Sequence, residues 1–187
     1  QDIVALVRSK DGRETTYALF VYGRNTDGQL VRLPYGDEKG MPVTLKSTPE
    51  RSLVADVWGD AQPELLFLQG NKPPVVLQWT ADQQFQEVVT TGSVSSGTIA
   101  GRAAFPVRWE DHPGLLVAQE NFARHLFLSP QQRWQVGEQI NSNESAARLA
   151  GAALVDLDGD RELEAVLIDP GVKKLRETLA QKAKSFN

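Results

Sequence analysis

The stretch from Asp156 to Glu164 gathers acidic side chains at a spacing that suits a hard metal ion. Asp156, Asp158, Asp160 and Glu164 occupy positions one, three, five and nine of a short loop, Gly159 stands among them, and an apolar run follows. Carboxylates held this close repel one another unless a cation or several backbone donors lie between them. Because a ligand set made only of oxygen atoms suits calcium best, the spacing predicts a calcium-binding loop.

The alternative for the same residues is an acidic turn without a metal. Asp and Gly are common in turns for conformational reasons alone, so some of these carboxylates can serve only to shape the backbone. An EF-hand is disfavoured, because position twelve is Leu167 and the flanking residues have the pattern of strands.

A weaker copy of the loop lies 100 residues earlier in the chain. The matched pairs are Asp56 with Asp156, Gly59 with Gly159, Asp60 with Asp160, and Glu64 with Glu164. Trp58 takes the place of the acid at position three. A metal ion in this second loop would therefore depend on Asp56, Asp60 and Glu64, with water completing its coordination.

At about half of this separation, roughly 50 residues, the same order of apolar runs and turns recurs and divides the chain into four units. Each unit contains short apolar or alternating runs separated by turn residues, for example 3–7, 17–23, 29–33 and 42–45 in the first unit. Four short strands at a period of about 50 residues are typical of β-propeller blades. The sequence predicts an all-β fold, a β-propeller of four-stranded blades in a single repeat domain over 1–187, with approximate units 1–50, 51–98, 99–148 and 149–187, the last of them incomplete.

The run from Ala153 to Asp160, closed by 164–167, resembles the FG-GAP or VCBS-type repeat of integrin α-subunit propellers and bacterial surface proteins. The match is strong in the fourth unit, partial in the second and architectural in the first and third. The resemblance implies a calcium ion in the inter-strand loop. Its ligands would be the carboxylates of Asp156, Asp158, Asp160 and Glu164 and the backbone carbonyl of Glu162.

The family's propellers usually have seven blades, so four units imply an incomplete ring or a fragment of a larger propeller. Missing blades or other chains would then complete the ring. Two departures from the family pattern stand out. Arg161 occupies position six, where family loops usually have Gly. In the third unit Pro106, Arg108 and Gly114 align with Asp156, Asp158 and Glu164, which predicts no metal there.

Composition limits the compartment and the class of partner. The 20 basic and 24 acidic residues give a net charge of −4, which does not suggest the basic surface that nucleic acid requires. No run of 18 apolar residues is present, so no membrane span is expected. Weak calcium sites fill where the ion is plentiful, as outside cells. The expected location is therefore extracellular, at the cell surface or periplasmic.

Catalytic patterns are not evident. His112 and His125 lie apart, each without a partner at a motif spacing, and no nucleophile elbow or phosphate-binding loop occurs. The sequence therefore predicts a non-enzymatic, calcium-binding β-propeller module for extracytoplasmic protein or glycan interaction. The alternatives are a metal-free structural scaffold and an enzyme with a site on the propeller axis.

Residues 172–187 combine two conflicting patterns. Their composition favours a helix, whereas the repeat register places a third strand and the start of a fourth there. We expect strand, because tertiary context often overrides helix propensity.

Overall fold

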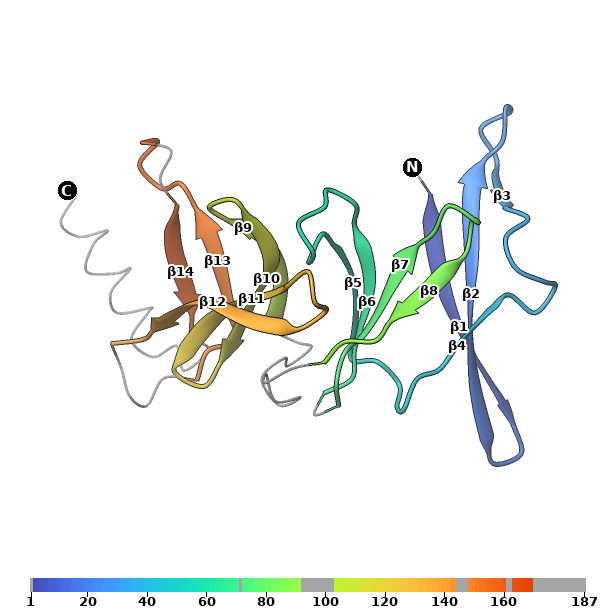
Figure 1. Ribbon diagram of the computed structural model, residues 1–187, viewed down its shortest axis with the longest axis horizontal. Helices are drawn as coiled ribbons and strands as arrows, with labels where there is room; N and C mark the ends of the chain where they lie inside the picture. Colours follow the sequence, from blue (N-terminus) through green and yellow to red (C-terminus); the bar gives the residue numbers. More distant parts are fainter. Residues whose placement is uncertain (1, 71, 92–102, 144–147, 161–162, 170–187) are drawn as a thin grey trace, which may run out of the picture.

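The computed structural model describes residues 2–70, 72–91, 103–143, 148–160 and 163–169. Within these ranges the chain forms 14 strands in four antiparallel sheets and contains no helix (Figure 1). The all-β prediction is confirmed for this part of the chain. Residues 172–187, Glu162 and Arg161 lie outside the described residues.

The strands of each sheet follow one another along the sequence. The first sheet contains β1 (Ile3–Asp11), β2 (Glu14–Arg24), β3 (Leu30–Arg32) and β4 (Met41–Val43). The second contains β5 (Arg51–Ala55), β6 (Glu64–Leu68), β7 (Val75–Trp79) and β8 (Phe85–Val88). The third contains β9 (Ala104–Trp109), β10 (His112–Gln119), β11 (Phe122–Leu128) and β12 (Trp134–Asn141). The fourth contains β13 (Gly151–Val155) and β14 (Glu164–Ile168).

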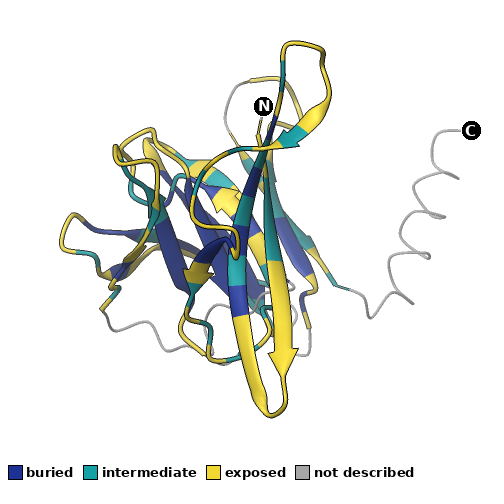
Figure 2. Ribbon diagram, turned by 90° about the vertical axis from the view of Figure 1, so that its right-hand side faces the viewer, coloured by how far each residue is buried: buried dark blue, intermediate teal, exposed yellow. Residues whose placement is uncertain are grey.

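The first sheet differs from a simple four-stranded meander. The 11-residue β2 pairs with β1 along one edge, and its other edge is shared by β3, opposite Tyr22 to Arg24, and β4, opposite Tyr17 to Leu19. A strand this long has room for two short partners on one edge. The far end of the β1–β2 hairpin extends beyond these partners and is exposed (Figure 2).

Two hairpins repeat each other in register across the 100-residue separation. In the second sheet Val54 pairs with Leu65 and Ala55 pairs with Glu64. In the fourth sheet the residues 100 positions later pair in the same way, Leu154 with Ala165 and Val155 with Glu164. Both hairpins therefore carry an eight-residue loop between the same two strand positions.

The third unit has a tight turn where these hairpins have a loop. Trp109 pairs with His112, so only Glu110 and Asp111 connect β9 to β10, and Glu110 adopts a φ of 50°. Pro106, Arg108 and Gly114 consequently lie within the two strands. The alignment of Pro106 and Arg108 with the loop residues Asp156 and Asp158 is therefore wrong in register, because β9 and β10 continue to the turn and leave no loop.

Neighbouring sheets pack face to face through shared apolar clusters. One cluster joins the first and second sheets, another joins the second and third, and a third joins the third and fourth. The central strand β6 is buried along its whole length because Leu65 and Phe67 face the first sheet while Leu66 and Leu68 face the third. Burial on both faces explains its continuous apolar sequence. None of the described sheets closes on itself.

A buried histidine fits between two glycines in the third sheet. His125 is 2% exposed on β11 and stacks between Trp109 and Phe127. A Cβ atom added at Gly114 would lie 2.8 Å from its Nε2, and one added at Gly137 would lie 2.7 Å from its Nδ1. Burial lowers the pKa of His125 below its ordinary 6.5, and the nearby His112 adds to this effect. The glycines on the adjacent strands thus make room for the ring.

Candidate metal centre

The loop between β13 and β14 brings three predicted ligands together. One carboxylate oxygen from each of Asp156, Asp158 and Glu164 lies within 4.8 Å of the other two. Asp160 does not belong to this group, and Glu162 lies outside the described residues. Spacings of this size allow a single cation to contact all three side chains, so this acidic triad can hold a metal ion.

Backbone amides of the loop orient the triad. The N–H of Gly159 donates to Asp156 Oδ1 at 2.6 Å, the N–H of Leu157 donates to Glu164 Oε2 at 2.7 Å, and the N–H of Asp160 donates to Asp158 Oδ1 at 3.3 Å. Gly159 has a φ of 84°, which glycine adopts without the steric cost that a Cβ would bring. The sharp turn at position four therefore folds the loop back toward its acidic side chains.

The triad is open to solvent. Asp156 and Asp158 are exposed and Glu164 is half-buried. An ion held here would keep water molecules in its coordination shell, as calcium does in weak sites with few protein ligands.

The second loop shares the glycine turn of the fourth-sheet loop, at Gly59 and Gly159, but does not form the same group of carboxylates. Gly59 N–H donates to Asp56 Oδ1 at 2.6 Å, as Gly159 N–H does to Asp156 Oδ1, and Ala61 N–H donates to Asp56 Oδ2 at 3.1 Å. Loop amides thus engage both oxygens of Asp56. The N–H of Gln62 occupies Asp60 Oδ1 at 2.9 Å. Among the described carboxylates, the triad at 156, 158 and 164 is the group that meets the distance requirement for a metal.

Trp58 explains much of this difference. It stands at the position of Asp158 and packs against the apolar cluster between the second and third sheets. The second loop therefore has an apolar anchor where the fourth has a ligand. The structure does not bring Asp56, Asp60 and Glu64 together as the weaker metal site that the sequence predicts.

Glu64 has an unusual environment for a carboxylate. The side chain is 0% exposed. Its Oε2 accepts the Val57 N–H at 2.9 Å, whereas Oε1 has no hydrogen-bond partner among the described residues. Burial raises the pKa of Glu64 to about 7, and the negative charges of Asp60 and Asp56 add to the rise against the opposing Val57 hydrogen bond. Sequence reasoning treated Glu64 and Glu164 alike and missed this difference. The four apolar residues after Glu64 are the signal for a strand covered on both faces.

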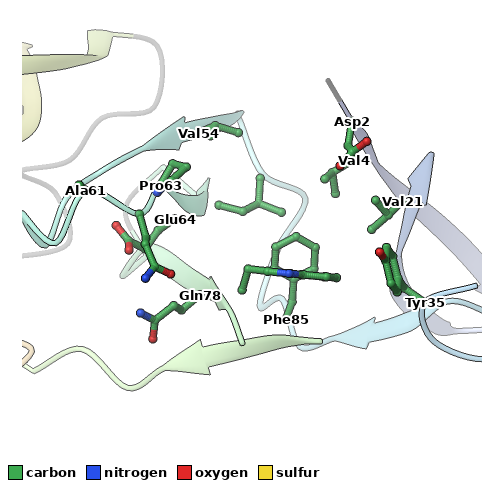
Figure 3. A pocket seen from close by; sticks show the side chains of 13 residues that line it. Asp2, Val4, Val21, Tyr35, Val54, Ala61, Pro63, Glu64, Gln78 and Phe85 are labelled. Carbon is green, nitrogen blue, oxygen red and sulfur yellow. The ribbon is translucent and has the colours of Figure 1, made fainter. Parts of the chain in front are cut away.

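A separate cleft lies between the first and second sheets (Figure 3). It has a volume of about 390 Å³, and we call it the aromatic cleft. Trp79 lies against Tyr35 and Phe85 edge to face, with ring centroids 5.1 and 4.8 Å apart. The lining residues are Asp2, Val4, Val21, Tyr35, Val54, Ala61, Gln62, Pro63, Glu64, Leu65, Gln78, Trp79 and Phe85.

Comparison with known proteins assigns no relatives to this chain. No protein-family model matches the sequence, and no curated protein matches it. No helix among the described residues is long and apolar enough to cross a membrane.

Proposed function

We propose that this chain is a non-enzymatic, calcium-binding module of β-propeller type that serves extracytoplasmic protein or glycan interaction. The observation that carries the proposal is the triad of Asp156, Asp158 and Glu164, whose oxygens converge within 4.8 Å in a loop ordered by its own amides. The role of the ion is to hold this hairpin together, because it offsets the mutual repulsion of the three carboxylates.

Calcium is the ion that the donor set favours. All three side chains offer carboxylate oxygens, which suit hard cations, and the triad lacks the nitrogen and sulfur ligands that zinc prefers. Calcium accepts irregular coordination completed by water and carbonyl oxygens, whereas magnesium requires a nearly ideal octahedron. A triad in which Asp156 and Asp158 are exposed leaves room for water in the coordination shell, which fits calcium better.

The blade architecture is supported by the repetition of elements. The second and third sheets are four-stranded meanders, successive sheets pack face to face, and the loop-bearing hairpins repeat in register. These are the properties of propeller blades, which bury their faces against their neighbours. Since none of the apolar clusters of the described residues joins the first sheet to the fourth, we infer that further blades or other chains complete the ring, as the resemblance to FG-GAP repeats implies.

Location follows from the affinity expected of the loop. An exposed triad binds calcium weakly, so it would be filled where calcium is abundant. This favours an extracellular, cell-surface or periplasmic protein.

A metal-free scaffold is the second candidate, and the second loop favours it. In that loop, backbone amides donate to both carboxylate oxygens of Asp56 and to one of Asp60. The fold can therefore close such a loop without an ion.

Thermal unfolding in excess EDTA and in millimolar calcium tests the proposal. An ion that binds only the folded state stabilises it by about 2.7 kcal/mol at 100 times its Kd, which raises the midpoint by roughly 5–10 °C in a chain of this size. We expect this rise in the wild type and its loss in Asp158→Ala.

The matched control is Asp60→Ala. Asp60, like Asp158, accepts the N–H of the residue two positions later, so both variants lose the same kind of turn hydrogen bond. Asp60→Ala should retain the calcium response. Identical curves with and without calcium in the wild type would favour the metal-free scaffold.

A further inference from the structure

The aromatic cleft has three half-buried aromatic rings in its wall. Tyr35, Trp79 and Phe85 each remain partly exposed, and the first lies beyond β3 of the first sheet while the others belong to the second sheet. Val54 adds an apolar side chain that is 61% exposed. The cleft therefore offers an apolar surface with aromatic faces to a ligand, at a volume within the usual range for ligand sites.

The residues of acidic or basic type that line this cleft are all acidic. Asp2 and Glu64 line it, and no Lys, Arg or His belongs to the lining. Asp2 is exposed, and Oε1 of the buried Glu64 has no hydrogen-bond partner within the described chain. Figure 3 shows Asp2 and Glu64 on opposite sides of the cleft. The exposed carboxylate of Asp2 beside an apolar cleft favours a ligand of positive charge.

Three aromatic rings elsewhere in the described residues already have a cation of their own. Guanidinium groups lie over Phe20, Phe105 and Phe122, at 4.4 to 4.7 Å from the ring centroids. The three arginines are Arg32, Arg51 and Arg124. No such contact involves the rings of the aromatic cleft within the same part of the chain. The rings of the cleft are thus open to a cation that comes from a partner.

We propose that the aromatic cleft binds a lysine side chain of a partner protein. The ammonium group pairs with the Asp2 carboxylate, and the four-carbon stem lies along Val4, Val21 and the aromatic rings. Long cationic side chains bind in this way, with the stem on apolar surface and the charge at a polar edge. The inference rests on the interaction role proposed above and assigns its partner class, a protein with an accessible lysine.

A neutral ligand is less well matched. A purely apolar side chain would leave the Asp2 carboxylate unpaired beside it, and burying a charged group without a partner is costly. A sugar could stack on the aromatic rings but would form no ion pair with the Asp2 carboxylate. A lysine side chain can contact the aromatic rings and also form an ion pair with Asp2.

Chemical-shift titration with N-acetyl-lysine methylamide tests the proposal. The titration follows the indole N–H of Trp79, and the neutral analogue N-acetyl-norleucine methylamide has nearly the same stem without the charge. We expect saturable shifts at Trp79 with the lysine probe, and binding about tenfold weaker for the norleucine probe, as for loss of one charged hydrogen bond. The lysine affinity should also fall in high salt.

Variants separate the charge from the apolar wall. Asp2→Asn should reduce the preference for lysine over norleucine about tenfold, whereas Asp27→Asn, at an exposed acid outside the cleft, should leave it unchanged. Phe85→Leu should weaken both probes because it removes an aromatic face. Since Asp2 is exposed, its variant should retain the fold.

The outcomes distinguish this inference from the calcium proposal. All titrations are run in EDTA and repeated in calcium, and calcium binding is measured on the same samples. Equal affinity for the two probes, no shift with lysine, or shifts at Trp79 with methyl glucoside alone would overturn the lysine site. None of these results alters whether calcium binds the triad, because no residue of the triad lines the cleft.

Discussion

The glutamates at position nine of the two loops, Glu64 and Glu164, differ in burial although they occupy equivalent positions. Glu64 and Glu164 pair with equivalent strand residues, and each accepts an N–H from the residue after the first loop acid. Glu64 is fully buried because its sheet lies between two others, whereas Glu164 is half-buried in the fourth sheet. The difference arises from packing, so the identical letters in the sequence could not reveal it.

The raised pKa of Glu64 predicts a pH-dependent stability in EDTA. Because its folded pKa is about 7 against an ordinary 4.5, the folded state holds a proton that the unfolded state releases. This group therefore makes the fold less stable as pH rises from about 4.5 to 8, by up to about 3 kcal/mol. Glu64→Gln cannot ionise and should lose this dependence.

Urea unfolding at pH 4.5 and pH 8 measures the effect as a difference between wild type and variant. Glu164→Gln is the control, since it makes the same substitution in the more exposed loop. If Glu64→Gln and the wild type lose the same stability between the two pH values, the burial account of Glu64 is wrong.

At the scale of elements, the strands and one loop could be predicted, and their pairings could be predicted only in part. Alternating and apolar runs with Gly and Asp turns indicated most strands, and the spacing of Asp156, Asp158 and Glu164 indicated the triad. The pairing of both β3 and β4 with one edge of β2 was missed, because the sequence of a strand does not indicate how many strands pair with each of its edges. The tight turn at Glu110 was missed because the apolar runs alone permit more than one register.

The close contacts of Gly114 predict a large effect of a single methyl group. A Cβ at this position would lie 2.3 Å from the carbonyl oxygen of Leu126 on the neighbouring strand and 2.8 Å from His125 Nε2. The backbone cannot move away cheaply, so Gly114→Ala should destabilise the protein by about 1–3 kcal/mol, the usual cost of overpacking. Denaturant unfolding measures it.

Gly151→Ala provides the comparison. Its nearest atoms would be 3.5 Å from the new Cβ, which is an ordinary contact. We expect a change within about 0.5 kcal/mol or a slight gain in stability, because alanine restricts the unfolded chain. Equal destabilisation by the two substitutions would contradict the close packing of Gly114 against Leu126 and His125.

At the scale of the whole molecule, four sheets succeed one another and are joined by three apolar clusters. The repeat spacing indicated this succession, because strands of one unit tend to pair within that unit. The sequence could not place the aromatic cleft, since its walls come from Val4, Tyr35 and Trp79 in two different units. The ring that the proposed propeller requires depends on the number of blades and their tilt, which the four units alone do not set.

The cluster between the second and third sheets predicts that their stabilities are coupled. Leu126 in β11 is 0% exposed and belongs to the same cluster as Leu66 and Leu68 of β6. Leu126→Ala should create a cavity that costs about 2–5 kcal/mol and should speed amide exchange in β6 as well as in β11.

Hydrogen exchange in the native state measures this coupling strand by strand. Leu149→Ala, in the cluster between the third and fourth sheets, is the control and should leave β6 exchange unchanged. Acceleration confined to the third sheet in Leu126→Ala would mean that the two sheets unfold independently.

Calorimetric titration of calcium into the metal-free protein tests the central claim most directly. The account predicts binding of one ion per chain at the described triad, lost in Asp158→Ala and retained in Asp60→Ala. Absence of binding by the wild type, or equal binding by the wild type and Asp158→Ala, would contradict it and leave the loop between β13 and β14 as an acidic turn.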